Sequence, residues 1–378
     1  MNINGYDAGW PSRSYSLRLI PGGCIRHLGL QIHLSNTSSG ICSRTNMVSA
    51  QFVNRKTIGI LLLIVIGIYG MQYTYKKLYF NDQHHKIIRM ANVSSASMPS
   101  CGIQGIFTEE RKIITPNLTQ VRSIFPDIRT DKCIESVKWK PIQPFSELEL
   151  IKYNECIKSN ADPKDVSTNS MRRLDRTVIY SHFTFLKRKS DVAIVEVGGY
   201  TGNLLRNLIP TTGAKYYVVI EPVPSFYSML SKSISMLRLN SSVTTYNFGL
   251  GKRYMDSAVG VQGDATAITK NSVGKRTEVI HVVSIVDFFI QLGLGCRSLD
   301  LLTINCEGCE FDVLETLIST NLIEKFEYIQ FQPHHAVPNL GNYPCRYCRL
   351  RQLLARTHVV AYDYPQVWEA WKNKKLIN

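Results

Sequence analysis

A glycine-rich turn could hold a nucleotide-like ligand. Gly198 and Gly199 directly follow an apolar run that ends in Glu196 and Val197, and Gly202 completes the turn. The first two glycines permit positive φ and let a ligand approach backbone N–H groups, while Gly202 lets the following helix pack near the turn. A glycine turn that binds no ligand is the alternative interpretation.

A second acid strengthens this prediction. Glu221 ends the next apolar run, in VVIEPVPSF. A carboxylate at that place can accept hydrogen bonds from both hydroxyls of a ribose, or else stabilise a helix N-terminus through its dipole. The dinucleotide fingerprint G-x-G-x-x-G is absent, because Tyr200 and Thr201 occupy the positions where its second glycine would fall. A nicotinamide or nucleotide-sugar enzyme is therefore disfavoured.

Side chains that could take up a proton follow two later apolar runs. Glu307 and Glu310 follow the run 299–304, and His334 and His335 follow the next one. These four are the candidate catalytic residues, because imidazoles and carboxylates are the side chains that most often act as general bases. Adjacent side chains on a strand face opposite sides, so only one histidine is expected to face the pocket. Ordinary loop histidines are the alternative.

The surrounding pattern predicts an α/β domain with a mostly parallel sheet and helices on both faces, because β-rich runs alternate with helical patterns. In such a sheet ligands bind beyond the C-terminal ends of the strands, where the glycine turn falls. The expected strands are 192–197, 216–220, 243–248, 299–304 and 328–331, and the expected helices are 146–157, 203–208, 225–237, 284–292 and 310–319. Residues 252–279 are predicted to form a binding loop or a solvated insertion.

Several successive segments resemble the motifs of the FkbM-type methyltransferase family, in particular its animal membrane-anchored members. They are VEVGGYTGN, VIEPVPSFYSML, the tract 282–287 and LDLLTINCEGCEFDVL. The resemblance covers roughly residues 192–331. It implies a class I methyltransferase (Rossmann-like) fold, S-adenosylmethionine as cofactor, and transfer of its methyl group to a hydroxyl oxygen.

The resemblance also implies roles for single residues. The turn with Glu196, Gly198 and Gly202 would hold the methionine part of the cofactor, and Glu221 would hold the ribose. Glu307 and Glu310 match the two acids of the family motif E-G-x-E, on the substrate side of the pocket.

One position departs from the family. Relatives often carry an Asp two residues before the first acid of that motif, and this chain has Asn305. Asn can form hydrogen bonds but cannot act as a base. A catalytically impaired domain that binds the cofactor or a partner is therefore the alternative function.

The cysteines allow several kinds of site. Cys306-x-x-Cys309 and Cys345-x-x-Cys348 fit disulfides, a zinc site or free buried thiols. Disulfides are favoured because eight cysteines, an even number, follow residue 75. No metal is expected, and a zinc-stapled adaptor is the rival interpretation.

The segment 57–75 contains no charged residue and would rise about 28 Å as a helix, enough to span a bilayer once. Basic residues flank it, and six of them against one acid precede it, which favours a cytosolic N-terminus. We therefore expect a type II signal anchor with a lumenal domain in the endoplasmic reticulum or Golgi. Sequons at Asn92, Asn117 and Asn240 agree with a lumenal glycoprotein.

The predicted organisation is a cytosolic tail (1–56), the anchor (57–75), a polar stem (76–140) and the methyltransferase domain (141–378). Residues 1–80 hold eight Lys/Arg and one Asp, so nearly half of the net charge of +15 lies outside the domain. No long basic run is present, so no nucleic acid is expected as a partner. The expected acceptor is a hydroxyl of a small molecule or a glycan. The sequence predicts no oligomeric state.

Overall fold

The second of two compact units contains every residue that is described below. These units are residues 1–94 and 95–378. The computed structural model describes residues 101, 121, 123–125, 130–261, 276–335, 337 and 340–377. The predicted anchor 57–75 and the sequons at Asn92 and Asn117 lie outside the described residues. Within the described part, no helix has the length and apolar character needed to cross a bilayer.

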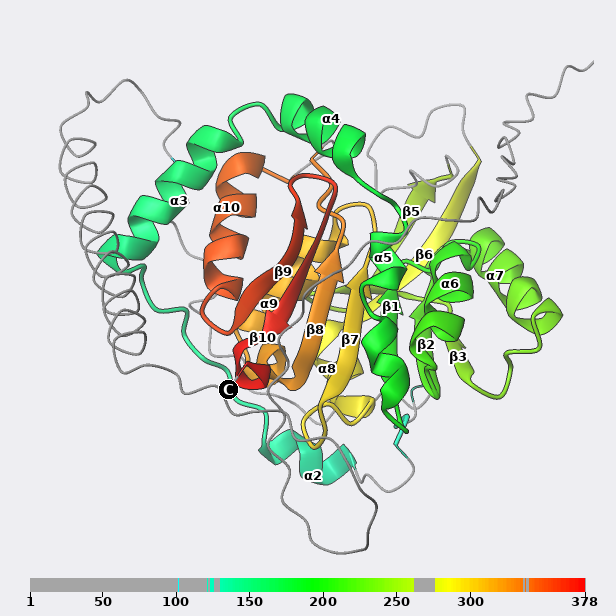
Figure 1. The fold of residues 1–378 in the computed structure, drawn as a ribbon. Helices are drawn as coiled ribbons and strands as arrows, with labels where there is room; N and C mark the ends of the chain where they lie inside the picture. Colours follow the sequence, from blue (N-terminus) through cyan, green and yellow to red (C-terminus); the bar gives the residue numbers. More distant parts are fainter. Residues whose placement is uncertain are drawn as a thin grey trace, which may run out of the picture. The chain divides into compact units, whose positions relative to one another are not determined.

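A seven-stranded sheet forms the centre of the domain (Figure 1), in the order β3-β2-β1-β7-β8-β10-β9. Its strands are β1 (Ala193–Val197), β2 (Tyr216–Ile220), β3 (Val243–Tyr246), β7 (Leu299–Ile304), β8 (Phe326–Phe331), β9 (His358–Tyr364) and β10 (Trp368–Asn373). Parallel pairing joins β1, β2, β3, β7 and β8, whereas β10 is antiparallel to both β8 and β9. The prediction of a mostly parallel sheet is confirmed.

The order of the strands reverses at β1. It pairs with β2 on one side, and the chain later returns to add β7 on its other side. Val197, the last residue of β1, is in register with Ile220 of β2 and Ile304 of β7. The segments that follow these three residues therefore leave the sheet at one edge. Ligands of open α/β sheets bind at such a switch point.

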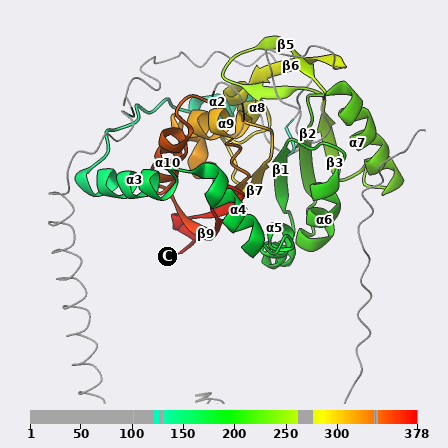
Figure 2. The same cartoon turned by 90° about the horizontal axis from the view of Figure 1, so that it is seen from above.

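Helices cover both faces of the sheet (Figure 2). One face packs against α8 (Ile285–Gln291), α9 (Cys309–Ile318) and α10 (Tyr343–Leu354), and the other against α6 (Asn203–Thr212) and α7 (Pro224–Met236). The remaining helices are α2 (Thr130–Glu135), α3 (Glu147–Ser159), α4 (Pro163–Arg173), α5 (Val178–Ser181), η1 (Thr184–Arg188), η2 (Asn321–Lys325) and η3 (Lys374–Leu376).

The apolar alternation within β1 explains why two helical layers form. Val195 and Val197 belong to the core cluster under α8, α9 and α10, while Ile194 belongs to the cluster under α6 and α7. All five residues of β1 are buried. A strand that is apolar on both sides can be stable only when both of its faces are covered.

Local signals fix the start of the helices. Ser146 and Glu149 form a capping box that begins α3, as the predicted helix 146–157 requires. Asp162 caps α4, whose first residue is Pro163. The expected loop 252–279 is partly wrong, because a small sheet with the order β4-β6-β5 includes β4 (Gly249–Gly251), β5 (Met255–Gly260) and β6 (Thr277–Ser284). β5 was missed because half of its residues are exposed and the strand shows no apolar alternation.

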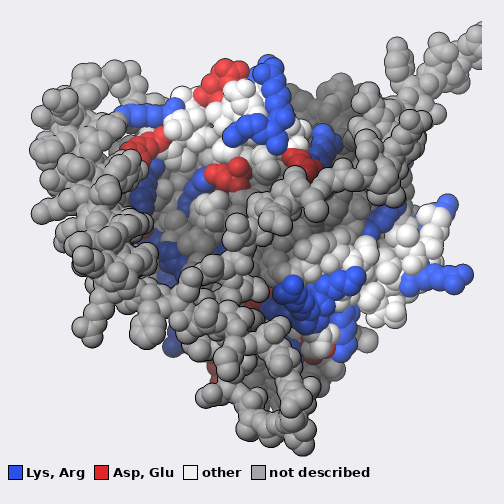
Figure 3. All heavy atoms as spheres, in the orientation of Figure 1, with Lys and Arg blue, Asp and Glu red and all other residues white. Residues whose placement is uncertain are grey.

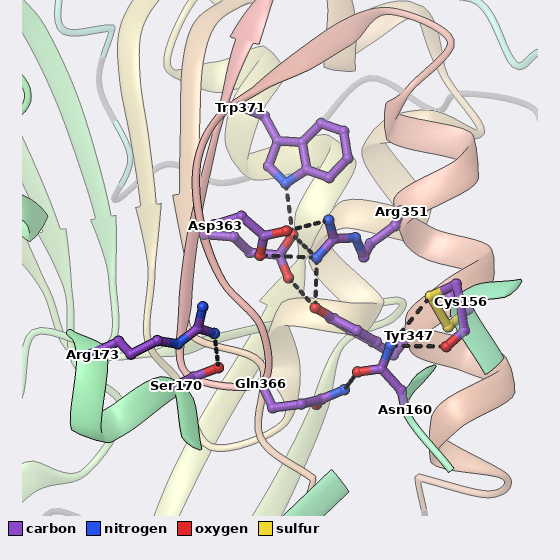
Figure 4. A network of polar contacts seen from close by, with 11 residues as sticks. Cys156, Asn160, Ser170, Arg173, Tyr347, Arg351, Asp363, Gln366 and Trp371 are labelled. Atoms are coloured by element: carbon purple, nitrogen blue, oxygen red, sulfur yellow. Dashed lines mark hydrogen bonds and ion pairs between the residues drawn. A yellow bond between two sulfur atoms is a disulfide. The ribbon is translucent and has the colours of Figure 1, made fainter. Parts of the chain in front are cut away.

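The C-terminal segment extends the sheet and is anchored by a buried polar network (Figure 4). Arg351 of α10 donates to Asp363 at 2.7 Å and to the Tyr347 hydroxyl at 2.8 Å. Glu369 is fully buried and accepts from Tyr347 at 2.7 Å and from the Trp371 indole at 3.0 Å. A buried carboxylate is tolerated when every partner is in place, so this network locks α10 onto β9 and β10.

The folded part begins before residue 141, so the predicted stem boundary needs correction. Val121 and Phe125 are each 1% exposed and lie in the main core cluster. Cys133 of α2 forms a disulfide with Cys296. Trp139 forms an isolated antiparallel β-bridge with Thr320, the residue before η2. The sequence did not predict this packing, because the segment before residue 141 is mostly polar and only a few of its apolar residues reach the core.

The surface of the described part carries charges of both signs. On the face drawn in Figure 3, basic and acidic side chains lie interspersed. Surface ion pairs include Lys140 with Glu324 at 2.8 Å and Lys215 with Asp191 at 2.7 Å. Screened pairs of this kind contribute little stability. The expectation that no nucleic acid binds stays a prediction.

Candidate functional site

The glycine turn after β1 is shaped by the end of β7. Gly198 has φ 91°, and a Cβ at this position would lie 1.8 Å from the carbonyl oxygen of Asn305. Asn305 in turn donates its N–H to Val197 at 2.8 Å. Gly199 is equally constrained, since its Cβ would lie 2.3 Å from Cγ2 of Val219. Both glycines are therefore required by close packing of strand ends.

The N–H groups of these glycines are already used. Gly198 and Gly199 both donate to the carbonyl oxygen of Ile220 at 3.0 Å, and Gly202 donates to Gly199 at 2.8 Å. The expectation that the N–H groups of Gly198 and Gly199 are open to a ligand is therefore wrong. What remains for a ligand is the surface left open by the missing side chains.

Glu221 ties the end of β2 to the glycine turn. Its Oε2 accepts from the Tyr200 N–H at 2.7 Å, and its Oε1 accepts from the Val223 N–H at 2.9 Å. Burial raises the pKa of Glu221 to about 7, against the opposite effect of these two hydrogen bonds. Each carboxylate oxygen has a second lone pair, so Glu221 can accept further hydrogen bonds from a ligand.

Glu196 lies behind the turn. It is 2% exposed, and its Oε2 accepts a hydrogen bond of 2.5 Å from the Tyr217 hydroxyl. Burial raises its pKa to about 8; the Tyr217 hydrogen bond opposes this shift, and the charge of Glu221 adds to it. In this structure Glu196 supports the turn from behind through its contact with Tyr217, and the cofactor contact that the resemblance implies for it stays a prediction.

The acids that follow β7 surround a histidine that follows β8. Nδ1 of His334 lies 3.2 Å from Oε1 of Glu310, and its Nε2 lies 3.0 Å from Oε1 of Glu307. The second contact is an ion pair without hydrogen-bond alignment, since Nε2 has no aligned acceptor in the described part. The register that pairs Ile304 with Phe331 brings the two segments together.

The electrostatics of this cluster change the role expected for His334. Burial lowers its pKa, but contacts with Glu307 and Glu310 outweigh that effect and raise the pKa to about 9. His334 is therefore protonated at neutral pH and is unsuited to take up a proton. His335 lies outside this cluster and packs edge-on against Tyr343, with ring centroids 6.0 Å apart. The expectation that only one histidine faces the pocket stays a prediction.

Glu310 and Glu307 differ in accessibility. Glu310 is fully buried and accepts from the N–H groups of Gly308 at 2.9 Å and His334 at 2.8 Å. The Glu307 side chain is 24% exposed. Glu310 therefore positions the cluster, and Glu307 is the more accessible of the two carboxylates.

A disulfide between Cys306 and Cys309 encloses the first acid of the motif. Cys345 and Cys348 do not pair with each other, because Cys345 bonds to Cys101 and Cys348 bonds to Cys156. All four of these cysteines are in disulfides, which the sequence favoured over zinc. In the described part no group of three or more His, Cys, Asp or Glu residues could hold a metal ion, and the expectation that no metal binds stays a prediction. The connectivity could not be read from the sequence.

Asn305 joins the two halves of the site. Its carbonyl oxygen meets Gly198, and Glu307 follows it by two residues. Among the described residues, its Oδ1 is buried and has no hydrogen-bond partner. A buried acceptor left unsatisfied is costly and calls for an explanation such as a ligand donor. The sequence had marked Asn305 only as the loss of an acid.

The sheet order, the glycine turn after β1 and the carboxylate after β2 define a methyltransferase-type Rossmann-like α/β fold. Residues 196–342 match the family model of the methyltransferase FkbM domain. This part of the chain is therefore similar to the methyltransferase FkbM domain. No curated protein sequence matches the chain.

Several solved structures with similarity to the chain are described as methyltransferases. A methyltransferase FkbM from Methylobacillus flagellatus is 14% identical, with a TM-score of 0.35, and the match covers 59% of each chain. M. capricolum TrmK in complex with S-adenosyl-homocysteine is 14% identical, with a TM-score of 0.28, over 51% of this chain and 68% of that one. Similarities of this size identify no substrate.

Proposed function

We propose that the protein is an S-adenosylmethionine-dependent methyltransferase that acts on a hydroxyl oxygen. The observation that carries this proposal is the junction at Asn305, which joins the glycine turn at Gly198 to the exposed carboxylate of Glu307. The glycine turn and this carboxylate are far apart along the chain but are held together at one edge of the sheet. M. capricolum TrmK, which is similar in fold, was solved with S-adenosyl-homocysteine, and this supports the choice of cofactor.

The residues around the turn fit the cofactor. Glu221, 5% exposed, offers its remaining lone pairs to the ribose hydroxyls. The unpartnered Oδ1 of Asn305 is a suitable acceptor for the ammonium group of the methionine part. Gly198 and Gly202 leave the surface of the turn without side chains, and Tyr200, packed on Phe226 with ring centroids 4.7 Å apart, borders it.

The bound cofactor would supply a methyl group on a sulfonium, which an oxygen nucleophile can displace in line. Glu307 takes the proton of the acceptor hydroxyl. His334, cationic at neutral pH, lies 3.0 Å from Glu307, and the buried Glu310 holds His334 in place. General base catalysis by one carboxylate contributes about 10²- to 10⁴-fold to a rate.

The experiment that tests donor binding is calorimetry on the full-length protein in detergent. S-adenosylmethionine and S-adenosyl-homocysteine are expected to bind, whereas NAD and a nucleotide sugar are not. A folded protein that gives no heat with either methionine derivative would contradict the proposal. Transfer of a labelled methyl group to a panel of glycans and small alcohols then tests the acceptor class.

A second candidate is a cofactor-binding domain without turnover. It is favoured by the protonated state of His334, because a protonated imidazole cannot take up the proton of a hydroxyl acceptor. Donor binding without methyl transfer to any hydroxyl acceptor would support this candidate.

The proposal also places the domain in the lumen of the endoplasmic reticulum or Golgi, anchored by residues 57–75, with a glycan hydroxyl as the acceptor. Four disulfides support an oxidising compartment. Asn240 is exposed in the turn after α7 and could carry a glycan. An endoglycosidase shift that Asn240→Gln reduces would support this topology, and the absence of any glycan would argue against it.

A further inference from the structure

The disulfide between Cys306 and Cys309 differs from the other three. Its sequence separation is 3, whereas the others link segments that are 163, 192 and 244 residues apart. It therefore closes a single turn and adds little to the cross-linking of the fold. Closing a short loop constrains an unfolded chain less than closing a long one.

Its exposure differs as well. Each long-range disulfide has one buried cysteine, namely Cys133, Cys345 or Cys348, with exposures of 0, 8 and 0%. In the short pair both Cys306 and Cys309 are partly exposed. Attack by an external thiolate needs access along the S–S axis, so accessible disulfides exchange first.

The position of the pair favours exchange in one direction. Cys309 is the first residue of α9, where the helix dipole stabilises a thiolate. Sγ of Cys306 lies 3.6 Å from Oε2 of the fully buried Glu310, whose negative charge disfavours a thiolate on Cys306. Cys309 is therefore the better leaving group, and Cys306 is the sulfur that is attacked.

We propose that the Cys306–Cys309 disulfide is a thiol-exchange site that takes dithiols as its substrate class, and that its reduction loosens the contact of Glu307 with His334. This inference does not depend on methyl transfer. It would stand if the domain only bound a cofactor, or if no acceptor were found.

The exchange reaction balances in two steps. A thiolate of the dithiol bonds to Sγ of Cys306, the S–S bond breaks, and its electron pair leaves on Sγ of Cys309. The second thiol of the reagent loses its proton, attacks the mixed disulfide and expels Cys306 as a thiolate, which takes up a proton. The products are a protein dithiol and a cyclic disulfide, so the protein gains the two electrons that the reagent loses.

The turn inside the disulfide explains why its opening would reach His334. Glu307 has φ 52° and Gly308 has φ 109°, both in the left-handed region. A non-glycine residue stays there only when its surroundings hold it. The disulfide is one such constraint on Glu307. Glu310 is expected to stay in contact with His334 after reduction. It accepts a hydrogen bond of 2.8 Å from the His334 N–H, and it lies outside the ring that the disulfide closes.

Stepwise reduction tests the first part of the proposal. The full-length oxidised protein is incubated with increasing dithiothreitol, alkylated, and mapped by peptide mass spectrometry. Cys306 and Cys309 are expected to be labelled at a dithiothreitol concentration about tenfold lower than any other pair, following the access argument. The pair Cys133–Cys296 is the internal control, because Cys296 is exposed while its partner is buried. Labelling of that pair first, or of all pairs together, would overturn the proposal.

Histidine NMR tests the second part. In the protein reduced only at Cys306 and Cys309, the pKa of His334 is expected to fall, because one of its two carboxylate neighbours has moved away. His281, which contacts Asp256 on the surface, serves as the reference signal. The double variant Cys306→Ser and Cys309→Ser should reproduce the reduced value without any reagent. An unchanged His334 titration in both samples would overturn the coupling.

Discussion

The carbonyl oxygen of Asn305 occupies the place where a side chain on residue 198 would begin. A Cβ at Gly198 would lie 1.8 Å from that oxygen, and Gly198 has φ 91°. The ends of β1 and β7 therefore touch through their backbones, and the glycine turn is a packing requirement before it is a binding feature.

Gly198→Ala should therefore destabilise the domain by about 2–4 kcal/mol, as overpacking and a strained φ act together. Gly341→Ala is the matched control, because Gly341 also has a positive φ of 72° but no atom within 4 Å of its Cβ position. It should cost about 1–2 kcal/mol. Urea unfolding of both variants is the measurement, and equal losses would contradict the steric argument.

Asn305→Leu should weaken S-adenosylmethionine binding about tenfold, because the hydrophobic side chain removes an acceptor from a buried place. Asn305→Asp keeps the acceptor and should bind the donor at least as tightly as the wild type. Calorimetry gives both affinities. If the Leu variant binds like the wild type, Oδ1 of Asn305 does not contact the donor.

Glu307→Gln should lower kcat about 10²- to 10⁴-fold and leave donor affinity unchanged, since only proton removal is lost. Glu327→Gln is the control, because Glu327 pairs with Lys189 near the opposite end of the sheet. Methyl-transfer kinetics with a hydroxyl acceptor provide the measurement. A Glu307→Gln enzyme with normal kcat would exclude Glu307 as the base.

Stability should fall as the pH rises through the titration of His334. Its pKa is raised from the usual 6.5 to about 9, so the folded state holds an extra proton between these values. The resulting stabilisation is complete below about pH 6.5 and is lost as the pH passes 9, with an upper limit of about 3 kcal/mol. Urea unfolding of His334→Gln between pH 6 and 9.5 should show a flatter dependence. His281→Gln should keep the wild-type slope.

Arg351→Met should destabilise the domain by about 3–5 kcal/mol, because it leaves the fully buried Glu369 without its cation, 3.3 Å away. Adding Glu369→Leu to this variant should recover part of the loss, since the uncompensated charge is then removed. The free energies of unfolding of the two single variants and the double variant form the test. Additive losses would contradict a coupled network.

The sequence predicted much of the parallel half of the sheet. The bounds of β2 and β7 agree with the apolar runs 216–220 and 299–304, and β1 differs by one residue. These strands are buried on both faces, so their composition alone marks them. The capping box of α3 could also be predicted from the sequence, because its two residues, Ser146 and Glu149, are only three positions apart.

The C-terminal elements could not be predicted in the same way. β9 alternates irregularly between intermediate and exposed positions, and β10 is shifted by a bulge at Ala370 and Trp371. Their stability depends on the network around Arg351, whose partners come from α10 and both strands. No short window of sequence contains such a network.

By itself, the sequence determined where the candidate site lies: a glycine turn after the first strand, an acid after the second, and the motif acids Glu307 and Glu310 after the fourth. Tertiary structure alone decided what these groups do. The N–H groups of Gly198 and Gly199 are consumed by Ile220, and His334 becomes a cation between two carboxylates. The physical reason is that donors, acceptors and charges take their state from neighbours brought together by strand register, and residue spacing along the chain does not contain that register.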